Sequence, residues 1–218
     1  MVTDTALVSA AFFCPRSRPP RIDYLTELRV FLERHPHGSL LLAHVSTLDE
    51  TWPLFIDAHP DIRALPHAQR DLSRLVAWSK GGPVPPVCET SAGFVALPLL
   101  LVLQLGQYLR YLQVHSLSHQ TFLRQVQAAG GIQGFCGGAA AALCVACAKD
   151  EAEVIANAAV LLRVVMGAGA LMDAAGDWSS TAPTTIVLRL KYEGQGEEIL
   201  GHYPDVSIFW ASLDDGPA

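Results

Sequence analysis

The chain has 218 residues, of which 50% are apolar and 17% are charged, and its formal net charge is −6 at pH 7. A chain of this length and composition is expected to fold as a globular protein with a large buried core. Its 15 Lys and Arg residues form no basic run, which argues against nucleic-acid binding.

Signals for export or membrane insertion are not evident. Ala6 to Phe13 is apolar, but no basic residue precedes it, so it does not resemble a secretory signal. The most apolar segment, Ala92 to Leu103, contains Pro98 and falls short of the roughly 20 residues that cross a bilayer. Five cysteines with no repeating spacing indicate reduced thiols. We therefore predict a cytoplasmic protein without a membrane partner.

The first part of the chain is predicted to contain one buried strand and several helices. Ala6 to Cys14 is short and apolar, as expected of a buried strand. Tyr24 to Arg34 and Ala68 to Ser79 place apolar residues on one face at helical spacing. The apolar run Leu40 to Val45 fits either a strand or a helix, and Leu48 to Pro66 is interpreted as a loop.

Longer helices are predicted in the middle of the chain. Ser91 to Leu112 is the longest candidate, and its first half is apolar nearly all round, so it is expected to pass through the core. Ala128 to Phe135 is rich in small residues and leads to Cys136. Gly138 to Lys149 is predicted as an alanine-rich helix, and Glu151 to Asp173 as a long helix with an acidic first turn.

After a short linker the composition changes to that of a strand, a helix and a second strand. Thr185 to Lys191 alternates apolar and polar residues, Glu193 to His202 is predicted as a short helix, and Val206 to Trp210 as a strand. Asp173 and Asp177, which precede this region, are interpreted as turn residues. The order of elements indicates the start of a second subdomain.

The residues Gly134-Phe135-Cys136-Gly137-Gly138 form a G-x-C-x-G motif, the thiol version of a nucleophile elbow. Such an elbow is a tight turn between a strand and a helix, where flanking side chains would collide with their neighbours, so glycines are needed. The following helix start favours a thiolate, and the Gly137 N–H could bind the oxyanion of a tetrahedral intermediate. Cys136 is therefore predicted to be an acyl-accepting nucleophile.

Several segments together resemble a known family. Gly134-Phe-Cys-Gly-Gly138 is followed by an alanine-rich helix and by Glu151-Ala-Glu-Val-Ile-Ala-Asn-Ala-Ala-Val-Leu-Leu-Arg163. Leu103-Gln-Leu-Gly-Gln-Tyr-Leu109 and Ile199-Leu-Gly-His-Tyr-Pro204 continue the likeness, which spans Phe94 to Phe209. This sequence is similar to the starter-unit acyl carrier protein transacylase domain at the N-terminus of fungal non-reducing polyketide synthases.

The resemblance implies a fold of the α/β class. It consists of an α/β hydrolase-like acyltransferase core with an inserted ferredoxin-like subdomain. Residues 1–178 would be the core, incomplete here, and residues 184–218 the beginning of the insertion. It further implies that Cys136 takes a starter acyl group from coenzyme A or a fatty acid synthase and passes it to the acyl carrier domain of the synthase. No bound cofactor is implied, since the acyl thioester is the substrate.

Two departures from the family pattern leave alternatives open. The family's catalytic base is a histidine well beyond the insertion, and only 82 residues follow Cys136 here. Phe12 to Arg16 lacks the glycine-containing loop that supplies a second oxyanion donor in the family. Two alternative interpretations remain. In one, the chain is a truncated, non-catalytic remnant with a docking or structural role, and in the other it is a thioester hydrolase of the same fold.

Other residues with reactive side chains receive structural interpretations. His202 is the only histidine after Cys136, but its place at a helix end favours a surface role over that of a base. His115 and His119 are expected to be solvated or to cap helices. Cys144 and Cys147 have the spacing of half a zinc site, yet no second ligand pair accompanies them, so both are predicted to be buried apolar residues and no metal site is expected.

Overall fold

The computed structural model describes residues 8–14, 21–65, 67–85, 92–175 and 194–202. The chain divides into two compact units, Met1–Gly176 and Asp177–Ala218. The described elements of the first unit are β1 (Ala11–Phe13), α1 (Ile22–Arg34), α2 (Pro36–Val45), α3 (Leu48–Ala58), η1 (Pro60–Ala64), α4 (Ala68–Ser79), α5 (Gly93–Val114), α6 (His119–Gln127), β2 (Ile132–Gly134), η2 (Cys136–Gly138), α7 (Ala139–Ala146) and α8 (Glu151–Ala175). The second unit contains α9 (Gln195–His202).

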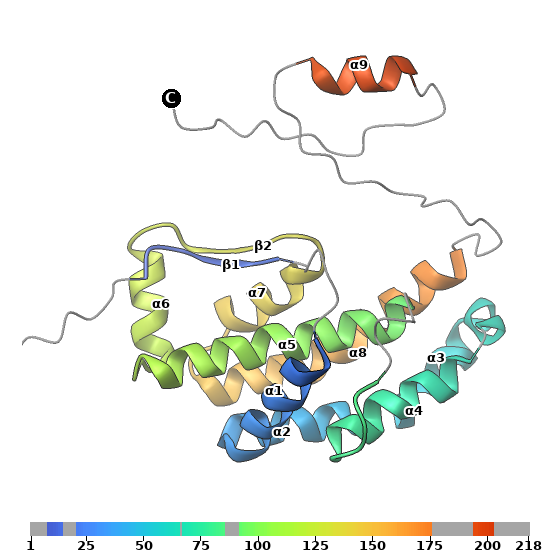
Figure 1. The fold of residues 1–218 in the computed structure, drawn as a ribbon, viewed down its shortest axis with the longest axis horizontal. Helices are drawn as coiled ribbons and strands as arrows, with labels where there is room; N and C mark the ends of the chain where they lie inside the picture. Colours follow the sequence, from blue (N-terminus) through green and yellow to red (C-terminus); the bar gives the residue numbers. More distant parts are fainter. Residues whose placement is uncertain (1–7, 15–20, 66, 86–91, 176–193, 203–218) are drawn as a thin grey trace, which may run out of the picture. The chain divides into compact units, whose positions relative to one another are not determined.

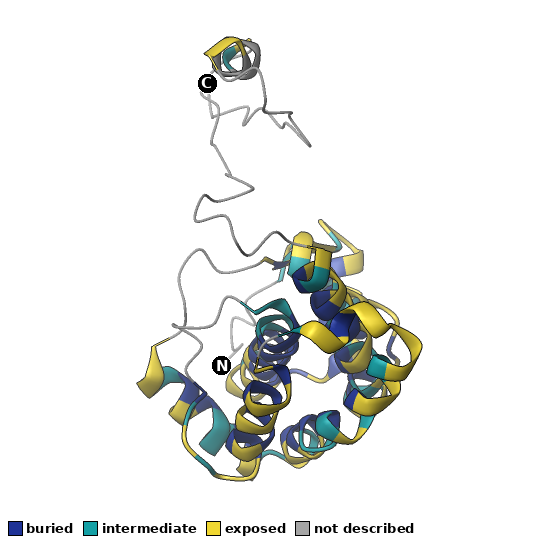
Figure 2. Cartoon of the chain, turned by 90° about the vertical axis from the view of Figure 1, so that its right-hand side faces the viewer, coloured by how far each residue is buried: buried dark blue, intermediate teal, exposed yellow. Residues whose placement is uncertain are grey.

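The first unit is mostly helical with a small parallel sheet, which fits the predicted α/β class. β1 pairs with β2 in parallel, with Phe13 opposite Gly134. The helices α5 and α8 run side by side through the unit, and the other helices surround them (Figure 1). Buried residues lie on the sides of the helices that face one another (Figure 2). The pair of long helices is therefore the centre of the core.

The close approach of α5 and α8 depends on glycine. A Cβ atom added at Gly169 of α8 would overlap the main chain of Gly93 and Phe94 at the start of α5. The two helices can therefore approach main chain to main chain at this crossing, and larger residues such as Leu101 and Leu162 fill the core further along. The prediction that the apolar segment after Ser91 passes through the core is confirmed.

Most predicted helices are found with similar bounds. The segments predicted from Tyr24, Ala68, Ser91, Gly138 and Glu151 correspond to α1, α4, α5, α7 and α8. The ambiguous run after Leu40 is helical, because it belongs to α2. The helix predicted before His202 is α9, whereas the strands predicted from Thr185 and Val206 lie outside the described residues.

The prediction of a loop between Leu48 and Pro66 is wrong. This region forms α3 and η1, with Pro53 inside α3. Proline in a helix interior removes one hydrogen bond and usually breaks the helix, which is why the sequence indicated a loop. Here the burial of Leu48 and Trp52 on one face of α3, each about 1% exposed, offsets that cost.

The helix α6 was not predicted from the sequence, which indicated a loop around His119. The sequence does carry a helical signal here, since the apolar residues Phe122 and Val126 lie four residues apart, and that signal was missed. The Ser118 side chain caps its first turn by accepting a hydrogen bond from the Thr121 N–H, and Phe122 and Val126 bury its inner face. A short helix of this kind is stabilised mainly by tertiary packing.

Two described helices, α5 and α8, have the length and apolar composition of membrane spans. Buried core helices meet the same criterion. For α5, 67% of the apolar window is buried within the protein, which is the behaviour of a core helix. For α8 the buried share is 44%, because its outer face carries residues such as Val160 and Met172, which are 59% and 66% exposed.

Candidate active site

Cys136 lies in a sharp turn that connects β2 to α7. Phe135 is still extended, Cys136 has a φ of 50°, and the helical turn η2 leads directly into α7. The Gly138 N–H donates to the Phe135 carbonyl at 2.9 Å and closes the turn. A residue other than glycine in this left-handed region costs about 1–2 kcal/mol. Because a thiol on a strained strand-to-helix turn is the arrangement of a nucleophile elbow, the local geometry matches the motif.

The glycines around Cys136 allow three close contacts, two with main-chain atoms and one with a side chain. A Cβ atom at Gly138 would overlap the Phe13 carbonyl oxygen of β1. One at Gly134 would lie 2.6 Å from the Ala139 Cα at the start of α7. One at Gly137 would lie 2.7 Å from the Leu100 side chain of α5. The elbow is therefore held between the neighbouring strand, its own helix and the central helix α5.

The carboxyl ends of β1 and β2 meet at the elbow. The Phe135 N–H donates to the Phe13 carbonyl at 2.9 Å, immediately before the turn. Cys14, the next residue after β1, is exposed and its carbonyl accepts a 2.9 Å hydrogen bond from Gln104 Nε2 of α5. In parallel sheets, ligands bind at the carboxyl ends of the strands, which is where the exposed Cys136 lies.

The histidine closest to the elbow in sequence is unsuited to act as a base. His119 is fully buried, and its ring nitrogens lie 2.6 Å from the Tyr108 hydroxyl and 2.9 Å from the Ala148 carbonyl oxygen. Both ring nitrogens are thus engaged in the core, so the expectation of a solvated or capping residue is wrong for His119. Burial also raises the pKa of Tyr108, and Glu151 adds to that effect. His115 is exposed at the end of α5, as expected.

Cys144 and Cys147 differ from each other in the structure. Cys144 is buried on the inner face of α7, and burial raises the pKa of its thiol to about 12. Cys147 is exposed, so the prediction that both are buried is wrong for Cys147. Cys144 lies within α7, whereas Cys147 is the residue that follows its last turn. In the described parts of the chain, no group of three or more His, Cys, Asp or Glu side chains could hold a metal ion.

The buried carboxylate of Asp173 in α8 binds the N-terminal end of the central helix α5. Asp173, 5% exposed, accepts hydrogen bonds from the Gly93 N–H at 2.9 Å and the Phe94 N–H at 3.1 Å. Burial raises the pKa of Asp173, and the two N–H donors oppose that shift. Its interpretation as a turn residue is wrong, because it lies within α8; Asp177 lies outside the described residues. An acid in the last turn of a helix is disfavoured by the helix dipole, which is the one signal that could have revealed its role.

Comparison with known proteins decides the family. The model of the family described as "Starter unit:ACP transacylase in aflatoxin biosynthesis" matches residues 55–196. The chain belongs to the starter unit:ACP transacylase family. Within the matched residues lie the elbow and the helices α5 to α8 that support it.

Similar proteins are large synthases. The non-reducing polyketide synthase Preu6 of Preussia isomera is 49% identical over 198 residues, which are 91% of this chain and 9% of that synthase. The synthase atr1 of Stereocaulon alpinum is 38% identical over 202 residues, 93% of this chain and 8% of the synthase. The synthase stbA of Stachybotrys bisbyi is 33% identical over 200 residues. The chain thus spans less than a tenth of the length of these first two relatives.

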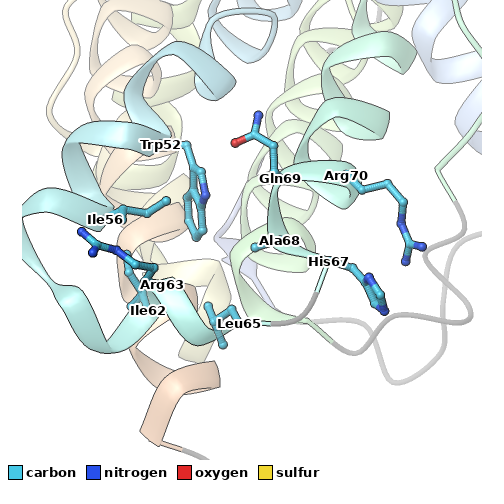
Figure 3. Close-up of a pocket in the computed structure, with 9 residues that line it drawn as sticks. All are labelled: Trp52, Ile56, Ile62, Arg63, Leu65, His67, Ala68, Gln69 and Arg70. Carbon is cyan, nitrogen blue, oxygen red and sulfur yellow. The ribbon is translucent and has the colours of Figure 1, made fainter.

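The protein also contains a pocket of about 350 Å³ that is separate from the elbow. It lies between α3, η1 and the start of α4, and Trp52, Ile56 and Leu65 form its apolar part. His67 and Arg70 also line it, but their side chains point away from Trp52 (Figure 3). No residue of the elbow lines this pocket, so it does not bring a ligand to Cys136.

Proposed function

We propose that this chain carries the acyl-accepting thiol of a starter-unit acyltransferase. The donor would be an acyl thioester of coenzyme A or of a fatty acid synthase carrier, and the acceptor the acyl carrier domain of a polyketide synthase. The observation that supports this most directly is the exposed thiol of Cys136 at a φ of 50°, on a strand-to-helix turn, in a chain of the transacylase family.

The reaction would proceed through an acyl-enzyme. The Cys136 sulfur attacks the thioester carbonyl, the carbon–sulfur bond to the donor breaks, and the donor leaves as a free thiol. The thiol of the carrier then attacks the acyl-Cys136 and releases the cysteine. Because all three acyl species are thioesters, each step exchanges one such bond for another, and the overall transfer is close to balanced.

The Gly137 N–H is the best-placed oxyanion donor that the elbow offers. It directly follows the nucleophile, in the position that supplies this donor in strand-to-helix elbows. The neighbouring Gly138 N–H is occupied by the Phe135 carbonyl, whereas no described residue accepts a hydrogen bond from the Gly137 N–H. Losing one oxyanion donor typically slows acyl transfer about 10²–10³-fold, so this donor is central to the proposal.

Mass spectrometry of the intact protein tests the nucleophile. After incubation with short and medium acyl coenzyme A donors, the wild-type chain should gain one acyl group and Cys136→Ala should gain none. Cys147→Ala is the matched control, because it removes another exposed thiol, and it should be labelled like the wild type. Equal labelling of the wild-type chain and Cys136→Ala would contradict the assignment of Cys136 as the nucleophile.

The fate of the acyl group separates a transferase from a hydrolase. Acyl-Cys136 protein is isolated and mixed with an acyl carrier protein that bears its phosphopantetheine arm. The proposal requires the acyl mass to appear on the carrier. Release of free acid at the same rate with and without the carrier would instead identify a thioester hydrolase, and a wild-type chain that accepts no acyl group would identify a non-catalytic piece of the fold.

A further inference from the structure

The buried amide of Gln104 is a polar group in an otherwise apolar part of α5. Gln104 is 5% exposed and lies between Leu103 and Leu105, which are also buried. Its Nε2 donates to the Cys14 carbonyl at 2.9 Å. Its Oε1 is buried and has no hydrogen-bond partner among the described residues. An unpaired buried acceptor costs free energy, so a residue of the same size without polar atoms would suit the core at least as well.

The position of Gln104 connects α5 to the elbow. Cys14 is the first residue after β1, and the preceding Phe13 carbonyl accepts the hydrogen bond from the Phe135 N–H. Phe135 directly precedes Cys136. The same helix contacts the elbow one turn earlier, where Leu100 lies against Gly137, and α5 runs below the two strands in the view of Figure 1.

We propose that Gln104 is a positioning residue that holds the carboxyl end of β1 against the elbow and so fixes the main chain around Cys136. This inference rests on the proposed function of Cys136. Attack on a thioester develops a negative oxygen that main-chain N–H groups must meet in the correct geometry. A β1 end that is free to move lets the Phe135 hydrogen bond open, and the turn then loses its alignment.

The test compares Gln104→Met with Tyr108→Phe. Methionine keeps the length of glutamine and removes its hydrogen bond to Cys14, and Gln104→Leu is a second apolar version. Tyr108 lies one turn further along α5, and its hydroxyl bonds His119 in the core, so Tyr108→Phe removes a buried hydrogen bond away from the elbow. The melting temperatures are expected to stay within about 4 °C of the wild type for the Gln104 variants.

Two reactions of Cys136 separate positioning from general destabilisation. Acylation by acyl coenzyme A passes through an oxyanion, whereas alkylation by iodoacetamide does not. In Gln104→Met, acylation should fall at least about tenfold, because small misplacements at a reacting centre have effects of this size. Alkylation should stay within about twofold, and Tyr108→Phe should leave both rates unchanged. Wild-type acylation in Gln104→Met overturns the inference.

Amide hydrogen exchange gives a readout that does not depend on catalysis. In Gln104→Met the Phe135 N–H should exchange about tenfold faster than in the wild type, since its bond to Phe13 opens more often. In Tyr108→Phe its exchange should not change. Unchanged exchange in Gln104→Met overturns the inference even if the wild-type chain accepts no acyl group, a result that would contradict only the proposed function.

Discussion

The elbow and the helix that follows it carry two cysteines in opposite surroundings. Cys136 is exposed in a left-handed turn, and Cys144, two turns along α7, is fully buried. Glycines flank Cys136 at positions 134, 137 and 138, whereas Leu143 and Val145 flank Cys144. The comparison teaches that thiol chemistry here depends on main-chain geometry and burial, and that the flanking residues already separate the two sites.

The largest expected effect is the difference in reactivity between the two thiols. At pH 8 a thiol with a pKa of about 12 is about 10³-fold less ionised than an ordinary cysteine. Iodoacetamide should therefore modify Cys136 in the folded protein long before Cys144. The Cys144 rate should rise about tenfold per pH unit, because the thiolate fraction rises with pH up to the pKa. Peptide mapping after timed alkylation measures both rates, and comparable rates at pH 8 would contradict the comparison.

Gly138→Ala tests the main-chain geometry of the elbow. The added Cβ would overlap the Phe13 carbonyl, so β1 must move away from the turn. We expect a loss of about 3 kcal/mol in the free energy of unfolding, as for severe overpacking, together with loss of Cys136 acylation. Urea unfolding measures the first effect. Gly201→Ala is the control, because a Cβ there meets no atom within 4 Å and should cost nothing.

Asp173→Ala tests the support of α5 at a distance from both thiols. Removing the carboxylate leaves the buried Gly93 and Phe94 N–H groups without their acceptor, which should cost about 2 kcal/mol of unfolding free energy. Because burial raises the pKa of Asp173 above its ordinary value of 3.8, the folded state binds the proton more tightly than the unfolded state. The stability contributed by this group is present below pH 3.8 and is lost as the pH rises through the raised pKa.

Urea unfolding at several pH values from 3.8 upward checks the direction in which Asp173 makes stability depend on pH. The stability of the wild type relative to Asp173→Asn should fall as the pH rises from 3.8, since the amide does not titrate there. A relative stability that rises with pH would show that the two N–H donors outweigh burial in setting the pKa.

The smallest effect is expected for Tyr108→Phe. The change removes one buried hydrogen bond, from the Tyr108 hydroxyl to His119, and keeps the ring that packs edge-on against Phe13. We expect a loss of about 1 kcal/mol in unfolding free energy and an unchanged alkylation rate of Cys136. An altered Cys136 rate would show that the core beneath β1 and the elbow are coupled through the aromatic contact.

The local sequence pattern was sufficient to predict those elements whose structure depends mainly on residues close together in the chain. The predicted bounds of α4, Ala68 to Ser79, are those observed, because its apolar residues recur on one face and its polar residues on the other. The same pattern failed at Pro53, where burial of Trp52 offsets the unfavourable proline. At Cys136 the glycine spacing predicted a tight turn, and the observed φ of 50° matches that prediction.

The sequence by itself determined the helices with one apolar face, the position of the glycine-flanked cysteine and the likeness to the transacylase family. Only the tertiary structure decided that Cys147 is exposed, that β1 pairs with β2, and that Gln104 and Asp173 bind main-chain groups far along the chain. The physical reason is that helix periodicity and turn chemistry depend on near neighbours in sequence. Burial and hydrogen bonding between distant segments depend on how complete surfaces fit together.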